Sequence, residues 1–176
     1  ETLVQATATR GRVVVFCTVP WQYAPNPRFV ELAVETLEHC RRAGALGFKI
    51  PKSLGLAARD IDGQRLHVDA PRLDPIFEAA GRLGMPVLIH SGDPRAFFEP
   101  SNPQNERWEE LHAHPDWQFP SLPFPSFLSI VEGLAAVVAR HPATTFIGAH
   151  VGCYAENLDW VGDVLRRCPN FYIDIS

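Results

Sequence analysis

Five short apolar runs, separated by stretches with helical spacing, constrain the fold of this chain more than any other feature. The runs are apolar almost throughout instead of alternating with polar residues, which is typical of parallel strands buried on both faces. They cover residues 12–19, 46–50, 86–90, 144–150 and 170–176. Strands that alternate with helices predict an α/β fold with a parallel sheet.

Four amphipathic segments between the runs predict the helices. They lie from Asn26 to Gly44, from Leu73 to Gly84, from Ser126 to Pro142 and from residue 155 to 168. Asn26 and Ser126 are predicted N-caps, and Gly44 and Gly84 are expected to end their helices. The chain has 176 residues, 46% of them hydrophobic, which suits one domain over residues 1–176.

Two folds fit five parallel strands: an open doubly wound sheet, or part of an eight-stranded (β/α)8 TIM barrel. A doubly wound domain would carry a glycine-rich phosphate loop after an early strand. Here the first run is followed by PWQYAPNP, and the second by PKSLGL. Residues with chemistry at the ends of several strands favour the barrel. The chain starts at Glu1 almost directly before a strand and stops at Ser176 in another, so we expect an incomplete barrel.

Polar or ionisable side chains stand at or near the ends of four apolar runs. They are Lys49, His90, His150 and Asp174. In a parallel barrel these ends form the mouth, where inward side chains face the active site. One strand-end histidine could equally be a hydrogen-bonded core residue, but two in matching positions predict a shared cavity. Neutral imidazoles suit a divalent cation, and the other role for such a histidine is that of a general base.

The roles of the neighbouring residues are less defined by the pattern. Lys49 could bind a substrate carboxylate, bridge metals as a carbamate, or pair with Asp174, which is expected to hold a neighbouring site residue in place or to serve the fold, and not to be a ligand itself. Asp93 and Arg95 follow the His90 strand and are expected to orient the imidazole or bind an anionic substrate group, and Asp93 could equally cap the loop. The Pro-, Trp-, Phe- and His-rich segment 91–125 is far longer than a usual connection, which predicts an active-site loop.

Several function classes are disfavoured by composition. Net charge is −4 with mixed signs, which argues against nucleic-acid binding, and the apolar runs are too short for a membrane span. The four scattered cysteines predict buried free thiols and favour the cytoplasm. His112-x-His114 has metal-pair spacing but lies in the loop segment, and Ser91 lacks a nucleophile-elbow motif. The expected partner is a small-molecule substrate, and homo-oligomer formation is left open.

The motifs PVLIHSGDP, TTFIGAHVG and NFYIDIS, in this order, resemble the amidohydrolase superfamily. The branch they are most similar to is the amidohydrolase 2 group, which includes aminocarboxymuconate semialdehyde decarboxylase. The resemblance implies strands three to seven of the barrel. It also implies that His90 is a metal ligand, that His150 binds metal or deprotonates the metal-bound water, and that Lys49 occupies the strand-four position. The family's strand-one H-x-H pair and strand-eight aspartate have no counterpart here, and Asp174 lies in the strand-seven match.

These observations together predict a metal-dependent hydrolase or decarboxylase that acts on a small organic acid or amide through a metal-activated water. Zinc is the expected ion, with manganese as the second choice. With only two of about five family site residues, the chain alone is expected to hold metal weakly and to be inactive. The alternatives are a non-catalytic barrel fragment that serves as a binding or scaffold module, and a doubly wound ligand-binding domain.

Overall fold

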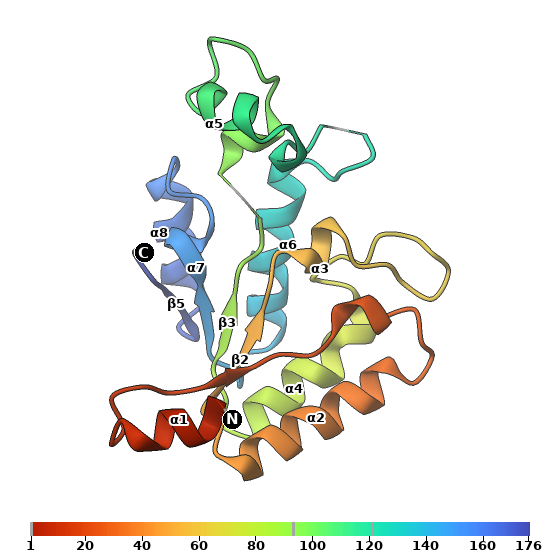
Figure 1. Cartoon of the computed structure of the whole chain (residues 1–176), viewed down its shortest axis with the longest axis vertical. Helices are drawn as coiled ribbons and strands as arrows, with labels where there is room; N and C mark the ends of the chain where they lie inside the picture. The colour runs from red at the N-terminus through yellow and green to blue at the C-terminus, as the bar shows by residue number, and fades with distance from the viewer. Residues whose placement is uncertain (1, 93, 121) are drawn as a thin grey trace.

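The computed structural model describes residues 2–92, 94–120 and 122–176, and within them one parallel sheet forms the centre of the molecule (Figure 1). The strands are β1 (Phe16–Cys17), β2 (Gly47–Ile50), β3 (Val87–Ile89), β4 (Phe146–Gly148) and β5 (Phe171–Ile173). Each lies inside a predicted run but is shorter than it. In the first run, Val13 and Val14 are exposed and precede the paired residues.

The strand order separates the two candidate folds. The strands lie in the sheet in the order β1-β2-β3-β4-β5, with every neighbouring pair parallel. A doubly wound sheet reverses its strand order at the switch point where ligands bind. No such reversal occurs in this sheet, so the doubly wound alternative is wrong. Consecutive parallel strands in chain order form an arc of a barrel wall.

The main helices connect successive strands. The helical elements are α1 (Thr2–Ala8), α2 (Phe29–Ala43), α3 (Ser53–Leu56), α4 (Asp74–Arg82), α5 (Trp108–Ala113), α6 (Phe127–Arg140), α7 (Ala149–Gly152) and α8 (Leu158–Arg167). Helix α1 is a correction, because the sequence was expected to enter a strand almost directly. The four predicted helices correspond to α2, α4, α6 and α8.

The helix caps follow the sequence in part. Gly44 ends α2 in the left-handed conformation with a φ of 106°, and the Ser126 side chain accepts a hydrogen bond from the Ser129 N–H at the start of α6. Asn26 does not cap α2. Its side chain accepts from the Arg28 N–H within a preceding turn, and the helix begins at Phe29.

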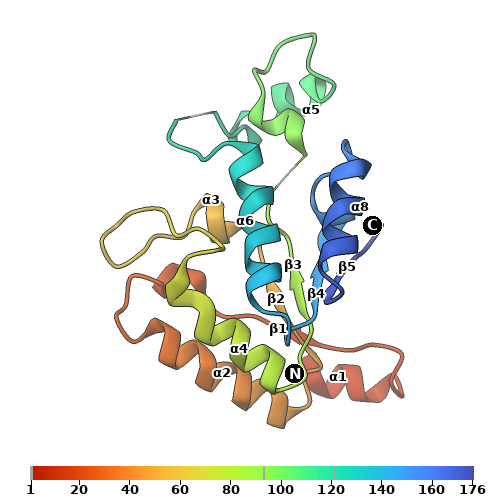
Figure 2. The same cartoon turned by 180° about the vertical axis from the view of Figure 1, so that it is seen from behind.

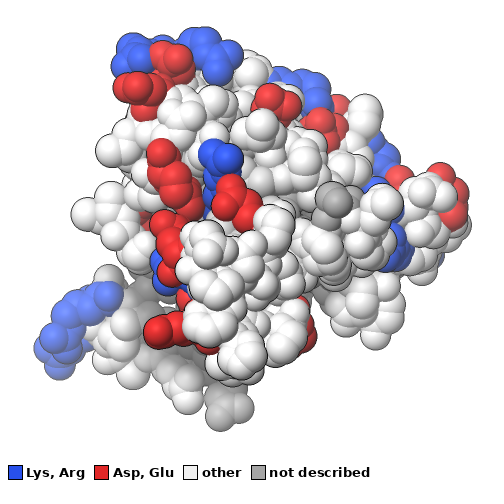
Figure 3. All heavy atoms as spheres, turned by 90° about the horizontal axis from the view of Figure 1, so that it is seen from above, with Lys and Arg blue, Asp and Glu red and all other residues white. Residues whose placement is uncertain are grey.

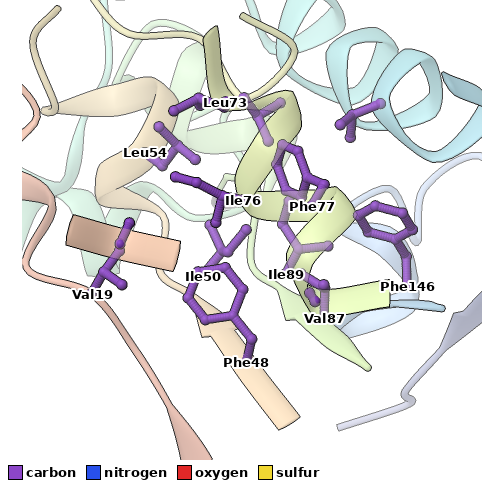
Figure 4. Packing of buried hydrophobic residues seen from close by; sticks show 14 of the residues in the cluster. Val19, Phe48, Ile50, Leu54, Leu73, Ile76, Phe77, Val87, Ile89 and Phe146 are labelled. Carbon is purple, nitrogen blue, oxygen red and sulfur yellow. The ribbon is translucent and has the colours of Figure 1, made fainter. Parts of the chain in front are cut away.

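All four connecting helices pack on one face of the sheet. Side chains at alternate strand positions, including Phe48, Ile50, Val87, Ile89 and Phe146, form one buried cluster with residues of α2, α4, α6 and α8 (Figure 4). Figure 2 shows α4 and α6 in front of the strands on this side. Burying each large apolar side chain contributes about 1.5–3 kcal/mol.

The opposite face of the sheet is only partly covered by the described residues. Lys49 pairs in register with Leu88, and Leu88 with Ile147, and all three are intermediate in exposure. Tyr172, the register partner of Ile147, is 56% exposed. The expectation of strands buried on both faces is therefore correct for the helix side alone. In a closed barrel this second face would line the interior.

The segment 91–125 between β3 and α6 has its own structure. It contains 3-10 turns at Arg95–Phe98 and Pro115–Trp117, and α5 between them. A small apolar cluster of Leu56, Phe97, Leu111, Phe119 and Ile130 joins it to the body. We call this segment the insertion. It leaves the C-terminal end of β3 and rises above the sheet (Figure 1).

The surface and the thiols agree with the composition. Figure 3, which looks onto the molecule from above, shows acidic and basic side chains interspersed on that face. The four cysteines form no disulfides with one another, and Cys153 and Cys168 are buried as predicted, whereas Cys17 and Cys40 are only partly buried. In the part of the chain that the structure describes, no helix is both long and apolar enough to cross a membrane.

Candidate active site

His90 and His150 lie together at the C-terminal end of the sheet. Their ring centroids are 4.8 Å apart, with the ring planes at 77°. His90 follows β3 directly, and its backbone N–H donates to Ile50 of the neighbouring strand at 3.0 Å. Both rings line a cavity of about 530 Å³. The structure thus brings the two sequence-predicted histidines to one site.

His150 reaches this site through an unusual turn. His150, Val151, Gly152 and Cys153 adopt φ angles of 52°, 57°, 69° and 61°, so the last three residues of α7 and the residue after it are all left-handed. This conformation costs roughly 1–2 kcal/mol for each residue with a Cβ. Gly148 permits the turn because a Cβ there would lie 2.8 Å from the Gly152 Cα. These two glycines explain the GAHVG motif in physical terms.

Asp174 holds the turn in place. Its Oδ1 atom accepts hydrogen bonds from the His150 N–H at 2.8 Å and from the Ser176 Oγ at 2.8 Å. Its backbone oxygen accepts from the Val151 N–H at 2.8 Å. Burial raises the pKa of Asp174, but the hydrogen bonds from His150 and Ser176 outweigh it and the pKa is lowered. The charged carboxylate is therefore the form that stabilises the turn.

The His150 ring is oriented by a backbone oxygen. Its Nδ1 lies 2.9 Å from the Ser176 backbone oxygen and 3.2 Å from the Ser176 Oγ, which itself donates to Asp174. Because a carbonyl oxygen can only accept, Nδ1 carries the proton, and Nε2 of the neutral ring keeps its lone pair. Metal-binding histidines are commonly oriented in this way, with the second ring nitrogen bonded to a carbonyl or carboxylate.

Lys49 lies on the partly covered face of the sheet. It pairs in register with Leu88, and His90 is two residues beyond Leu88, so Lys49 and His90 are on the same face. Burial lowers the pKa of Lys49, and the charges of Cys153 and Asp174 oppose that shift. Lys49 forms no ion pair with any residue that the structure describes. Lys49 is not among the residues that line the cavity, but no described carboxylate neutralises its ammonium group.

Arg95 is placed differently from the other predicted site residues. Its guanidinium donates to Glu99 at 2.9 Å, and it is not part of the cavity lining. Its backbone N–H donates to Glu156 at 3.2 Å, which ties the insertion to the segment before α8. Asp93 lies outside the described residues. The assignment of Arg95 and Asp93 to substrate binding stays a prediction.

The cavity lining contains residues that the sequence did not single out. They are Gly92, Pro94, Glu106, Arg107, Cys153, Ala155, Glu156 and Ser176. The sequence could have pointed to Arg107 as a candidate site residue, since it is the only Lys or Arg between Arg95 and Arg140. His112 and His114 do not line the cavity and stack instead on Trp108 and Trp117.

The donor set fits part of a metal centre. Two imidazoles on adjacent rigid elements suit zinc, manganese or a related ion. Among the described residues, no group of three or more His, Cys, Asp or Glu side chains could hold a metal ion. His90 and His150 are therefore the candidate ligands in the described part of the chain, which does not contain a complete metal-binding set.

Comparison with known proteins agrees with the barrel fold. The chain is similar in fold to 2,6-dihydroxybenzoate decarboxylase from Rhizobium, with a TM-score of 0.57 and 23% identity over 90% of this chain and 45% of that one. A second similar structure is a dihydroxybenzoic acid decarboxylase from Polaromonas sp. JS666 with bound manganese and the inhibitor 2-nitroresorcinol. Its TM-score is 0.59 and its sequence identity 20%, over 98% of this chain and 53% of that one. A TIM-barrel protein from Bordetella bronchiseptica has a TM-score of 0.59 and 15% sequence identity, over 99% of this chain and 47% of that one.

The chain spans about half the length of these solved structures, so its sheet is an incomplete TIM barrel. No curated protein matches the sequence. The family model described as amidohydrolase matches residues 5–176, nearly the whole chain. This match shows that the chain belongs to the amidohydrolase family.

Proposed function

We propose that the natural protein is a metal-dependent hydrolase or decarboxylase of small organic acids or amides, with His90 and His150 as ligands of its divalent ion. The observation that carries this proposal is the 4.8 Å separation of the two imidazole rings at the C-terminal end of a parallel sheet. Membership of the amidohydrolase family supports it. The manganese reported for the Polaromonas decarboxylase makes manganese as reasonable a candidate as zinc.

His150 and Asp174 have different roles in this proposal. The Nε2 lone pair of His150 faces away from Ser176, which leaves it able to bind a cation or accept a proton. A divalent ion held there would polarise a substrate carbonyl and lower the pKa of a coordinated water to roughly 7. Asp174 acts through the backbone of His150 and is a positioning residue.

Lys49 is proposed to bind and stabilise negative charge on the substrate. Its ammonium lies on the same sheet face as His90 and has no carboxylate partner among the described residues. Such a group can hold a carboxylate before decarboxylation or a developing oxyanion during hydrolysis. Burial lowers its pKa, which also eases proton transfer from the ammonium near neutral pH.

The insertion is proposed to form the wall of the substrate cavity. It contributes Glu106 and Arg107 to the lining and is joined to the segment before α8 by the hydrogen bond to Glu156. The cavity of about 530 Å³ has the size of a small-molecule site.

Cysteines without disulfides suit a reducing compartment, so we propose that the protein lies in the cytoplasm.

Metal analysis of the natural full-length protein tests the proposal. We expect a stoichiometric divalent ion in the wild type and at least a tenfold loss of metal affinity in His90→Ala and His150→Ala. His112→Ala is the matched control, because His112 stacks on Trp108 outside the cavity. Absence of stoichiometric metal after growth with zinc and with manganese would leave the scaffold alternative in its place.

An activity screen separates the two reactions. The metal-loaded protein is tested against amides, lactones, and aromatic or unsaturated carboxylic acids, with CO₂ release and hydrolysis products measured side by side. The proposal expects one of these activities, and expects it to be lost in both histidine variants. An activity that survives in both would show that the histidine pair does not carry the reaction.

A further inference from the structure

The cavity is lined by one permanently charged cation, and the insertion provides it. Of the described lining residues, Arg107 is the only Lys or Arg, and the histidine pair lies in the same cavity. A guanidinium matches the shape of a carboxylate and can bind it through two parallel hydrogen bonds. Arg107 is therefore the lining residue best suited to bind an anionic group of a substrate.

The backbone at Arg107 is fixed by Asn105. The Asn105 Oδ1 accepts a hydrogen bond from the Arg107 N–H at 2.8 Å. Its amide nitrogen donates to the backbone oxygens of Ala96 at 2.8 Å and Pro100 at 3.2 Å. One side chain thus connects both ends of the loop 96–107 and sets the point from which Arg107 extends.

The Arg107 side chain is weakly engaged by the protein. Among the described residues, its guanidinium makes one hydrogen bond, from Nη1 to Glu110 at 3.3 Å. Both side chains of this pair are well exposed, at 48% and 38%. Exposed pairs of this kind contribute about 0–1 kcal/mol. A substrate carboxylate can replace Glu110 at little cost, and most of the five N–H donors of the guanidinium remain available to it.

Arg95, the other arginine of the insertion, is engaged differently. Its Nε donates to Glu99 at 2.9 Å, and the side chain lies outside the cavity lining. The acidic lining residue Glu156 accepts the Arg95 backbone N–H, so part of its capacity is used to hold the insertion. Arg107 is therefore the better placed of the two cations to meet a ligand.

We propose that Arg107 is the specificity-determining residue of this site, and that it binds an anionic group of the substrate remote from the reacting group at the histidine pair. This inference rests on the proposed function, because it takes the reacting group to lie at His90 and His150. It names the substrate class more closely: a small acid with a second carboxylate, or an equivalent anion, in addition to the group that reacts.

Calorimetric titration of the natural full-length protein tests this with three benzoates that differ only at the meta position. Isophthalate carries a second carboxylate there, 3-carbamoylbenzoate a neutral amide, and 3-(aminomethyl)benzoate an ammonium group. We expect the wild type to bind isophthalate about 10–100-fold more tightly than 3-carbamoylbenzoate. Arg107→Ala should abolish this preference while leaving the affinity for 3-carbamoylbenzoate unchanged, and Arg107→Lys should keep part of it.

Two further variants make the result specific. Arg28→Ala is the matched control, because Arg28 is also exposed and paired with a glutamate three residues later, but lies outside the cavity. It should retain the full preference. If Arg95→Ala removes the preference instead, the assignment to Arg107 is overturned.

Other outcomes also overturn the proposal. These are equal binding of isophthalate and 3-carbamoylbenzoate by the wild type, an equal loss of both in Arg107→Ala, and tightest binding of 3-(aminomethyl)benzoate. The last would point to Glu106 and Glu156 as the recognition groups. Titrations before and after chelation separate this proposal from the proposed function, because a preference that depends on Arg107 can persist in protein that never held metal.

Discussion

The carboxylate of Asp174 accepts a hydrogen bond from the backbone N–H of His150 at 2.8 Å, just beyond the ends of the paired strands β4 and β5. Through this contact Asp174 determines where the His150 imidazole, a candidate metal ligand, stands. The left-handed turn at His150 is costly for residues with a Cβ, so it needs such a partner.

Replacing Asp174 should weaken both the fold and the metal site. Asp174→Ala removes the acceptor of the exposed His150 N–H, which should cost about 0.5–1.5 kcal/mol of unfolding free energy. Metal affinity should fall about 10–100-fold, as for other groups that orient a ligand. Urea unfolding and competition with a chromophoric chelator measure the two effects. Asp163→Ala is the control, because Asp163 makes an exposed ion pair on α8. If the two variants behave alike, Asp174 has no special role.

The pH dependence of stability should report the same carboxylate. The unfolded chain titrates at a pKa of about 3.9 for Asp, and the folded pKa of Asp174 is lower. Between these values the unfolded state binds more protons, so the stabilisation is complete above the unfolded pKa and is lost as pH falls through the folded pKa. Wild type should therefore lose more stability than Asp174→Asn between about pH 5 and pH 2. Parallel curves for the two proteins would contradict the assignment.

The two glycines of the GAHVG motif should tolerate alanine poorly. A Cβ at Gly148 would lie 2.8 Å from the Gly152 Cα and from the Phe171 ring, so Gly148→Ala should force the turn apart. We expect the free energy of unfolding to fall by at least about 2 kcal/mol and the His150 imidazole NMR signals to change. Gly162→Ala is the control, since its nearest neighbour is the flexible Arg166 side chain and alanine favours the helix by about 0.5–1 kcal/mol. Gly148→Ala with native stability and native imidazole signals would argue against this turn.

The core prediction concerns the helix side of the sheet. Phe48 of β2 is fully buried against the helices. Its ring stacks on Trp21, with the two ring centroids 6.4 Å apart. Phe48→Ala should cost about 3–5 kcal/mol of unfolding free energy, measured by urea denaturation. Tyr23→Ala, which truncates an aromatic ring that is 61% exposed, should change stability by less than about 0.5 kcal/mol. A small effect at Phe48 would mean that the helices do not pack on this face.

Much of the fold could be predicted from the sequence, because the deciding signals are local. Strand-length apolar runs, helical spacing, Gly44 and Ser126 depend on residues a few positions apart, and the structure has these elements in the predicted order. The strand limits were less well predicted, because pairing with a neighbouring strand decides where a strand begins. Helix α1 was missed altogether.

The candidate site was predicted in outline only. The positions of His90 and His150 at strand ends follow from the sequence, because the C-terminal ends of parallel strands meet at one edge. The turn that aims His150 depends on Asp174, 24 residues later, and the cavity wall depends on how the insertion folds over β3. The tertiary structure therefore placed Arg107 in the lining and Arg95 outside it, since contacts between residues distant in the chain leave no periodic signal in the sequence.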